Sequence, residues 1–93
     1  MTDAAVIDPI AEIERLRAEV EALRRRAEAA EAALAKAMEL VAMIDRTLSD
    51  PATFAGDAAK AAALGRRRQD AQAALEAAER EWIEAQEAYE ALR

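Results

Sequence analysis

Apolar residues recur at alternating steps of three and four residues, from Ile13 to Leu48 and again from Ala61 to Leu92. This spacing draws one apolar stripe along a helix, and over more than four heptads it is typical of a coiled-coil seam. Only Arg68 puts a charge in the stripe. The predicted core residues are Leu16, Val20, Leu23, Leu34, Val41, Ile44, Leu48, Leu64, Leu75, Trp82, Tyr89 and Leu92. The pattern therefore predicts two long helices.

Capping residues mark the ends of these helices. Asp8 before a proline suits an N-cap followed by proline at the first helical position, and Asp50 before Pro51 repeats the signal. Gly56 can adopt a positive φ and end a short helical turn over 51–55, after which Asp57 can cap the next helix. We therefore predict a flexible tail over 1–8, a helix over 9–48, a turn over 49–57 and a helix over 58–93.

A connection of about nine residues favours antiparallel neighbours, so the predicted fold class is all-α, a two-helix antiparallel coiled-coil hairpin. Folding at the turn sets Ala27 opposite Trp82, and Leu16 opposite Leu92. Large residues then face small ones, as native packing density requires.

Leu40 and Met43 lie beside the seam. They could cover Phe54 or face a second hairpin, so dimerisation into a four-helix arrangement is a further hypothesis.

Arg68 falls opposite Val41 in this register, and three interpretations are open. The side chain could extend past Val41 to water, pair with a carboxylate such as Asp45 or Glu39, or act as a polar device that fixes the register. Extension to water is the interpretation we favour from the sequence.

The composition argues against several classes of function. The 93 residues suffice for one domain, and the absence of Cys and His removes disulfides and the usual zinc sites. A two-helix hairpin offers no cleft to shift carboxyl pKa values, and the hydroxyl side chains have no His base. We expect no enzyme activity, metal, cofactor or small-molecule substrate. No apolar run is long enough to span a bilayer, so we expect no membrane contact and a cytoplasmic location.

Charge is unevenly distributed along the predicted hairpin. Residues 43–70, called the tip below, carry five basic and four acidic side chains, whereas the rest carries eight basic and fifteen acidic ones. The net charge of −6 argues against general nucleic-acid binding, so phosphate contact is expected only at the tip. Its candidate residues are Arg46, Lys60, Arg66, Arg67 and Arg68. The alternative is a solvated surface with intrahelical pairs such as Glu21–Arg25 and Glu76–Arg80.

The turn and second helix carry a more specific pattern: Leu48, then Asp50-Pro51 with Phe54 nearby, then the leucine heptads that end at Trp82 among acidic residues. Over residues 48–92 the chain resembles the C-terminal coiled-coil domain of Uup-type ABC-F ATPases. That resemblance implies binding of DNA or of structured RNA on the ribosome. Asp50, Pro51 and Phe54 are the turn residues it points to, although Phe54 can equally be structural.

The ATPase part of such proteins is missing, because no G-x-x-x-x-G-K-[ST] motif occurs and the only glycines are Gly56 and Gly65. A free-standing protein and a fragment of a larger one both fit. Two functions follow as expectations. One is a nucleic-acid-binding hairpin that uses its tip. The other is a scaffold or adaptor coiled coil that binds itself or a partner helix.

Overall fold

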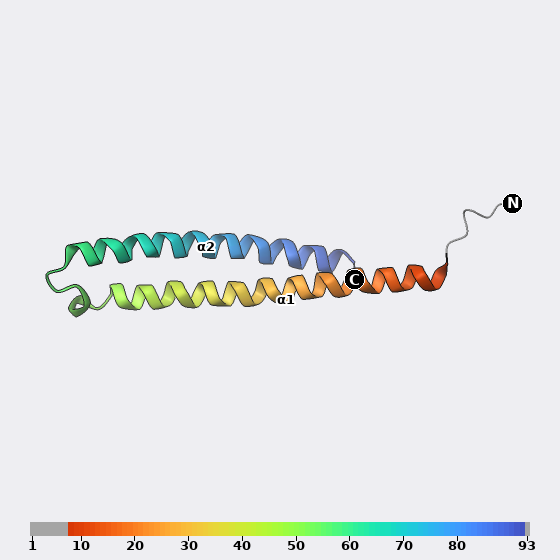
Figure 1. The fold of residues 1–93 in the computed structure, drawn as a ribbon, viewed down its shortest axis with the longest axis horizontal. Coiled ribbons are helices and arrows are strands. Elements are labelled where there is room, and N and C mark those ends of the chain that lie inside the picture. The colour runs from red at the N-terminus through yellow and green to blue at the C-terminus, as the bar shows by residue number, and fades with distance from the viewer. Residues whose placement is uncertain (1–7, 93) are drawn as a thin grey trace.

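The computed structural model describes residues 8–92 and confirms the helical hairpin. Helix α1 spans Pro9–Leu48, a short 3-10 helix η2 spans Pro51–Phe54, and helix α2 spans Ala58–Ala91. The two long helices run side by side in opposite directions, joined at the loop that contains η2 (Figure 1). The tail predicted over 1–8 lies outside the described residues apart from Asp8, and so does Arg93.

The predicted caps form at each helix start. The Asp8 carboxylate accepts a hydrogen bond from the Ile10 amide at 3.0 Å, and Asp50 accepts one from the Ala52 amide at 3.1 Å. Asp57 accepts from the Lys60 amide at 2.9 Å, which starts α2. Gly56 has φ +77°, a conformation that a side chain would strain, so the turn depends on glycine there.

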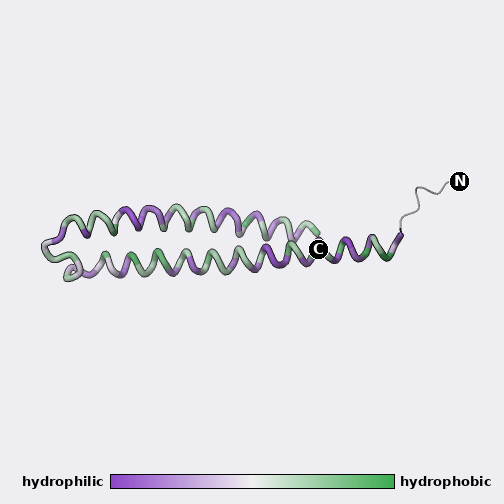
Figure 2. The backbone as a smooth tube through the Cα atoms, in the orientation of Figure 1, coloured by the Kyte–Doolittle hydropathy of each residue, from purple (hydrophilic) through white to green (hydrophobic). Residues whose placement is uncertain are grey.

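The core consists of two separate clusters along the seam. Near the turn, Val41, Ile44 and Ala71 are buried, and the partly buried side chains packed on them are Leu48, Leu64 and Leu75. Farther along, a cluster of Ala27, Ala30 and Ala85 is covered by Trp82, in agreement with the predicted meeting of Trp82 and Ala27. Apolar and polar segments alternate along both helices (Figure 2). Both clusters combine side chains of α1 and α2, as an antiparallel hairpin requires.

Trp82 has one polar atom without a partner in the described part of the chain. Its indole Nε1 is buried and makes no hydrogen bond there. A buried donor of this kind costs roughly 1–3 kcal/mol when nothing accepts from it. Trp82 therefore stabilises the hairpin through the apolar area of its ring over the alanines, and its indole N–H adds no stabilising bond among the described residues.

The prediction that Leu16 and Leu92 belong to the core is wrong. Leu16 is 43% exposed and Leu92 is 44% exposed, since no further layer covers them within residues 8–92. Helix α1 continues outward past the end of α2 (Figure 1). Neither helix within residues 8–92 contains a stretch long and apolar enough to cross a membrane.

Candidate functional site

Arg68 is held by a carboxylate and does not simply extend to water, so the interpretation that the sequence favoured is corrected. Its Nε donates to Asp45 Oδ1 at 2.9 Å and its NH2 group donates to Asp45 Oδ2 at 3.2 Å. A third bond runs from Arg68 to Gln72 Oε1 at 2.9 Å. The two-pronged contact satisfies the planar guanidinium at the edge of the seam and ties α1 to α2.

This pairing shifts the titration of the partner carboxyl. The hydrogen bonds from Arg68 hold the pKa of Asp45 below its usual range, with the charge of Arg68 as a lesser cause. Because Arg68 already pairs with Asp45, it is not among the tip cations that lack an ion-pair partner.

The other four predicted tip cations are exposed, and no carboxylate among the described residues pairs with them; they are Arg46, Lys60, Arg66 and Arg67. Of the tip's four acidic residues, Asp45 is bound to Arg68, while Asp50 and Asp57 accept from amides at helix starts. Four of the five tip cations are therefore without an ion-pair partner among the described residues, although the five basic and four acidic side chains of the tip still sum to +1.

Two of these cations border a hollow between the turn and α2. Lys60 and Arg67 are seven residues apart, two helical turns, so they project from the same side of the helix. The hollow has a volume of about 220 Å³, and its other lining residues are Thr47, Thr53, Phe54, Ala63 and Leu64. Cationic groups, hydroxyls and an aromatic ring are the groups that contact phosphate, sugar and base in nucleic-acid interfaces.

The turn residues named by the resemblance lie in the predicted turn, but they differ in how exposed their side chains are and in whether they are already hydrogen-bonded. Pro51 is exposed at the start of η2, and Phe54 is partly buried at its end. Asp50 is occupied as the η2 cap. Phe54 is thus both part of the turn's packing and part of the lining of the hollow.

Several arginines away from the tip are bound by glutamates, although Arg17 and Arg80 have no ion pair among the described residues. Arg24 reaches Glu21 at 2.6 Å and Glu28 at 2.7 Å, and Arg25 reaches Glu21 at 3.2 Å, which confirms the predicted Glu21–Arg25 pair. Hydrogen bonds from Arg24 and then Arg25 lower the pKa of Glu21.

Across the helices, Arg26 bonds Glu81 at 2.8 Å and lowers the pKa of that carboxyl. Arg15 pairs with Glu12 on the same helix. The predicted Glu76–Arg80 pair is not among the ion pairs of residues 8–92.

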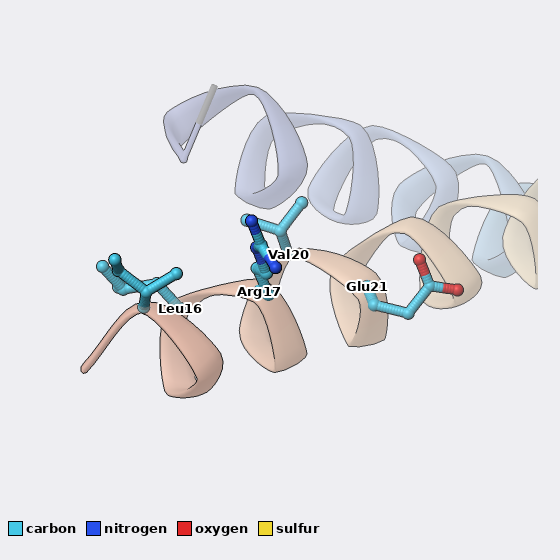
Figure 3. A pocket seen from close by; sticks show the side chains of 5 residues that line it. Leu16, Arg17, Val20 and Glu21 are labelled. Carbon is cyan, nitrogen blue, oxygen red and sulfur yellow. The ribbon is translucent and has the colours of Figure 1, made fainter. Parts of the chain in front are cut away.

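A groove at the open end is a feature that the sequence interpretation missed. It has a volume of about 430 Å³ and is lined by Ile13, Leu16, Arg17, Val20 and Glu21 (Figure 3). Its apolar lining consists of the first residues of the heptad stripe, Ile13, Leu16 and Val20, of which the first two are exposed. Within residues 8–92, no group of three or more Cys, His, Asp or Glu residues is arranged to hold a metal ion.

Comparisons of the chain with protein-family models, curated proteins and solved structures find no match. The resemblance to the Uup-type domain therefore stands on its own residues, Leu48 to Trp82, and remains an expectation.

Proposed function

We propose that the protein is a non-enzymatic helical hairpin that contacts the phosphate backbone of DNA or structured RNA with its tip. The observation that carries the proposal is the charge contrast between the two ends. Four exposed cations at the tip have no carboxylate partner among the described residues. Away from the tip, Arg15, Arg24, Arg25 and Arg26 have such a partner, whereas Arg17, Lys36 and Arg80 do not. Unpaired Lys and Arg side chains can release counterions from a phosphate backbone, which drives binding of this kind.

The acidic remainder of the hairpin limits how nucleic acid can approach. A strand lying along the whole hairpin would meet an excess of carboxylates, so contact through the tip alone is favoured. The hollow beside Lys60 and Arg67 gives such a contact a defined place, with Phe54 in its lining. The resemblance of the turn to the Uup-type domain points to the same part of the molecule.

A titration of labelled duplex DNA and of a labelled RNA hairpin, followed by fluorescence anisotropy, tests this function. With four phosphate contacts, affinity should fall about 100-fold between 50 and 200 mM salt. Replacing all four tip cations by glutamine should abolish binding. The matched control replaces Arg15, Arg17, Arg24 and Arg25 by glutamine, which changes net charge equally and should retain binding. Equal loss in both variants, or binding insensitive to salt, contradicts the proposal.

A second candidate function is self-association or adaptor binding through the side of the hairpin. Leu40 is 42% exposed and Met43 is 50% exposed. A shallow groove of about 250 Å³ beside Leu40 is bordered by Arg67 and Asp70, charges that a second copy related by a two-fold axis could pair reciprocally. Sedimentation of the protein against a Leu40→Gln/Met43→Gln variant tests it. A concentration-independent monomer in both cases contradicts it.

A further inference from the structure

The hollow between the turn and α2 has a floor and a rim of different character. Its exposed lining residues are the cations Lys60 and Arg67, whereas the others are half-buried: Thr47, Thr53, Phe54, Ala63 and Leu64. Ala63 and Leu64 lie between the two cations on one face of α2, because residues 60, 63, 64 and 67 follow the helical repeat. The two cations are about 10 Å apart along the helix axis, so they border a largely apolar floor on both sides.

The floor of the hollow does not suit a phosphate group. A phosphate placed against Phe54, Ala63 and Leu64 would lose bound water against side chains that offer no hydrogen-bond donor. Of the two hydroxyls in the lining, that of Thr47 already donates to the Met43 carbonyl oxygen at 3.1 Å. Phosphate contact therefore belongs at the rim, and the floor is left for an uncharged group.

A nucleobase fits both parts of the hollow. The faces of a base stack on aromatic side chains such as Phe54, and the backbone on each side of its sugar carries a phosphate. The volume of about 220 Å³ is below the roughly 300–1,000 Å³ of pockets for drug-sized ligands, so the group that enters is small. A single base on the floor would direct its two flanking phosphates toward Lys60 and Arg67.

The pairing state of the base decides which nucleic acid can use the hollow. A base that is stacked and paired inside a duplex cannot reach the floor unless it is extruded. Extrusion costs free energy, and the cost is least for a base that is already unpaired. Bulges and loops of structured RNA offer such bases to aromatic side chains. An unpaired nucleotide beside a duplex therefore suits the tip better than a continuous duplex does.

We propose that the hollow binds one unpaired nucleobase at a bulge or loop of DNA or structured RNA, with the base on the apolar floor and its flanking phosphates at Lys60 and Arg67. The proposal rests on the proposed function of the tip and gives that function a preferred substrate. Arg46 and Arg66 lie outside the lining of the hollow, so their contacts serve a paired and a bulged duplex alike.

Three labelled RNA hairpins of one sequence serve as probes. The first is fully paired, the second has one bulged uridine, and the third has an abasic site at the position of the bulge. Matching DNA hairpins form a second set. Binding to the 93-residue protein is measured by fluorescence anisotropy at one salt concentration. The bulged hairpin should bind at least about fivefold more tightly than either of the others, because only it supplies a base for the floor.

Uncharged variants locate the base in the hollow. Ala63→Leu fills the floor and should bring the bulged hairpin within about twofold of the paired one. The matched control is Ala62→Leu, on the neighbouring exposed surface outside the lining, which should keep the full preference. Phe54→Leu keeps an apolar side chain in the turn but removes the ring, so it should also reduce the preference to about twofold or less. Circular dichroism of each variant checks that the helices are retained.

Equal binding of the bulged and abasic hairpins overturns the proposal, and so does a preference that Ala63→Leu leaves intact. If Ala63→Leu does not fold, Phe54→Leu decides in the same way. In these cases salt-dependent binding through the four tip cations still stands, so the two failures are distinguishable. Failure of every hairpin to bind overturns both. An acidic peptide with one phenylalanine is titrated alongside, and tighter binding of that peptide, lost in Ala63→Leu, would assign the hollow to a protein partner and overturn the proposal.

Discussion

The two ends of the hairpin share one seam but differ in packing and in charge. Near the turn, the buried residues are large and branched, Val41 and Ile44, with three leucines around them. Toward the open end, the buried residues are alanines covered by one tryptophan. Since stabilisation follows the apolar area removed from water, the turn half should hold the helices together more strongly than the open half.

The charge contrast follows the same axis. Four of the five cations at the tip have no carboxylate partner among the described residues, whereas Arg24, Arg25 and Arg26 toward the open end are each bound by a glutamate. One seam therefore joins two regions that differ both in packing and in the pairing of their cations. The predictions below test whether the halves differ as strongly as the packing indicates.

The largest expected effect is from Ile44→Ala in the turn-side cluster. Ile44 is only 6% exposed, and truncating a buried isoleucine costs about 2–4 kcal/mol. Leu16→Ala, at a seam position that is 43% exposed, should cost about 0.5 kcal/mol or less. Thermal and urea unfolding by circular dichroism measure both.

If Ile44→Ala leaves the chain unfolded in buffer, all proteins can be compared in the same concentration of TMAO, which strengthens burial. Equal losses for Ile44→Ala and Leu16→Ala would mean that the open end is as well covered as the turn half.

A smaller effect is expected from Trp82, the one large side chain of the alanine cluster. Trp82→Ala should lower the free energy of unfolding by about 2–3 kcal/mol, because the ring is only partly buried over the alanines. Trp82→Phe keeps an aromatic ring and removes the buried indole N–H that has no partner among the described residues. It should therefore cost less than about 1 kcal/mol.

The same unfolding curves distinguish the roles of the ring and of its nitrogen. A loss for Trp82→Phe as large as that for Trp82→Ala would show that Nε1 makes a stabilising hydrogen bond, for example to water. The alanine cluster would then depend on a polar contact, and the contrast with the wholly apolar turn-side cluster would sharpen.

Most of the backbone could be predicted from the sequence because its signals are local and agree with one another. The caps at Asp8, Asp50 and Asp57 each form as predicted, and the helix bounds match the heptad pattern closely. The positive φ of Gly56 was likewise predictable, since only glycine adopts it without strain.

The errors concern side chains whose environment depends on both helices at once. For Arg68 the sequence left pairing with Asp45 open but favoured extension to water, and the folded structure shows the Asp45 pair. Leu16 and Leu92 fit the seam by spacing, yet a stripe does not show where its partner ends. The unpaired cations of the tip could not be predicted either, because the rotamers that form or avoid ion pairs are chosen in the folded state.

The smallest expected effects concern the two ion pairs that join the helices, Asp45–Arg68 near the turn and Arg26–Glu81 toward the open end. Both carboxyl pKa values are lowered in the folded protein, first by the hydrogen bond from arginine. At acidic pH the unfolded chain therefore binds more protons at these groups than the folded chain does. Their stabilisation is complete above about pH 5 and is lost as pH falls.

Asp45→Asn should accordingly lower the unfolding midpoint slightly at neutral pH, and the difference from the unsubstituted protein should shrink as the pH falls below about 4 and the native carboxyl takes up its proton. Glu81→Gln should behave in the same way with a smaller shift, because Arg26 is 40% exposed and Arg68 is 33% exposed. Midpoints of the three proteins across this pH range measure both effects. A larger shift for Glu81→Gln would reverse the comparison, since the more solvated pair would then contribute more, against the usual screening of exposed charges.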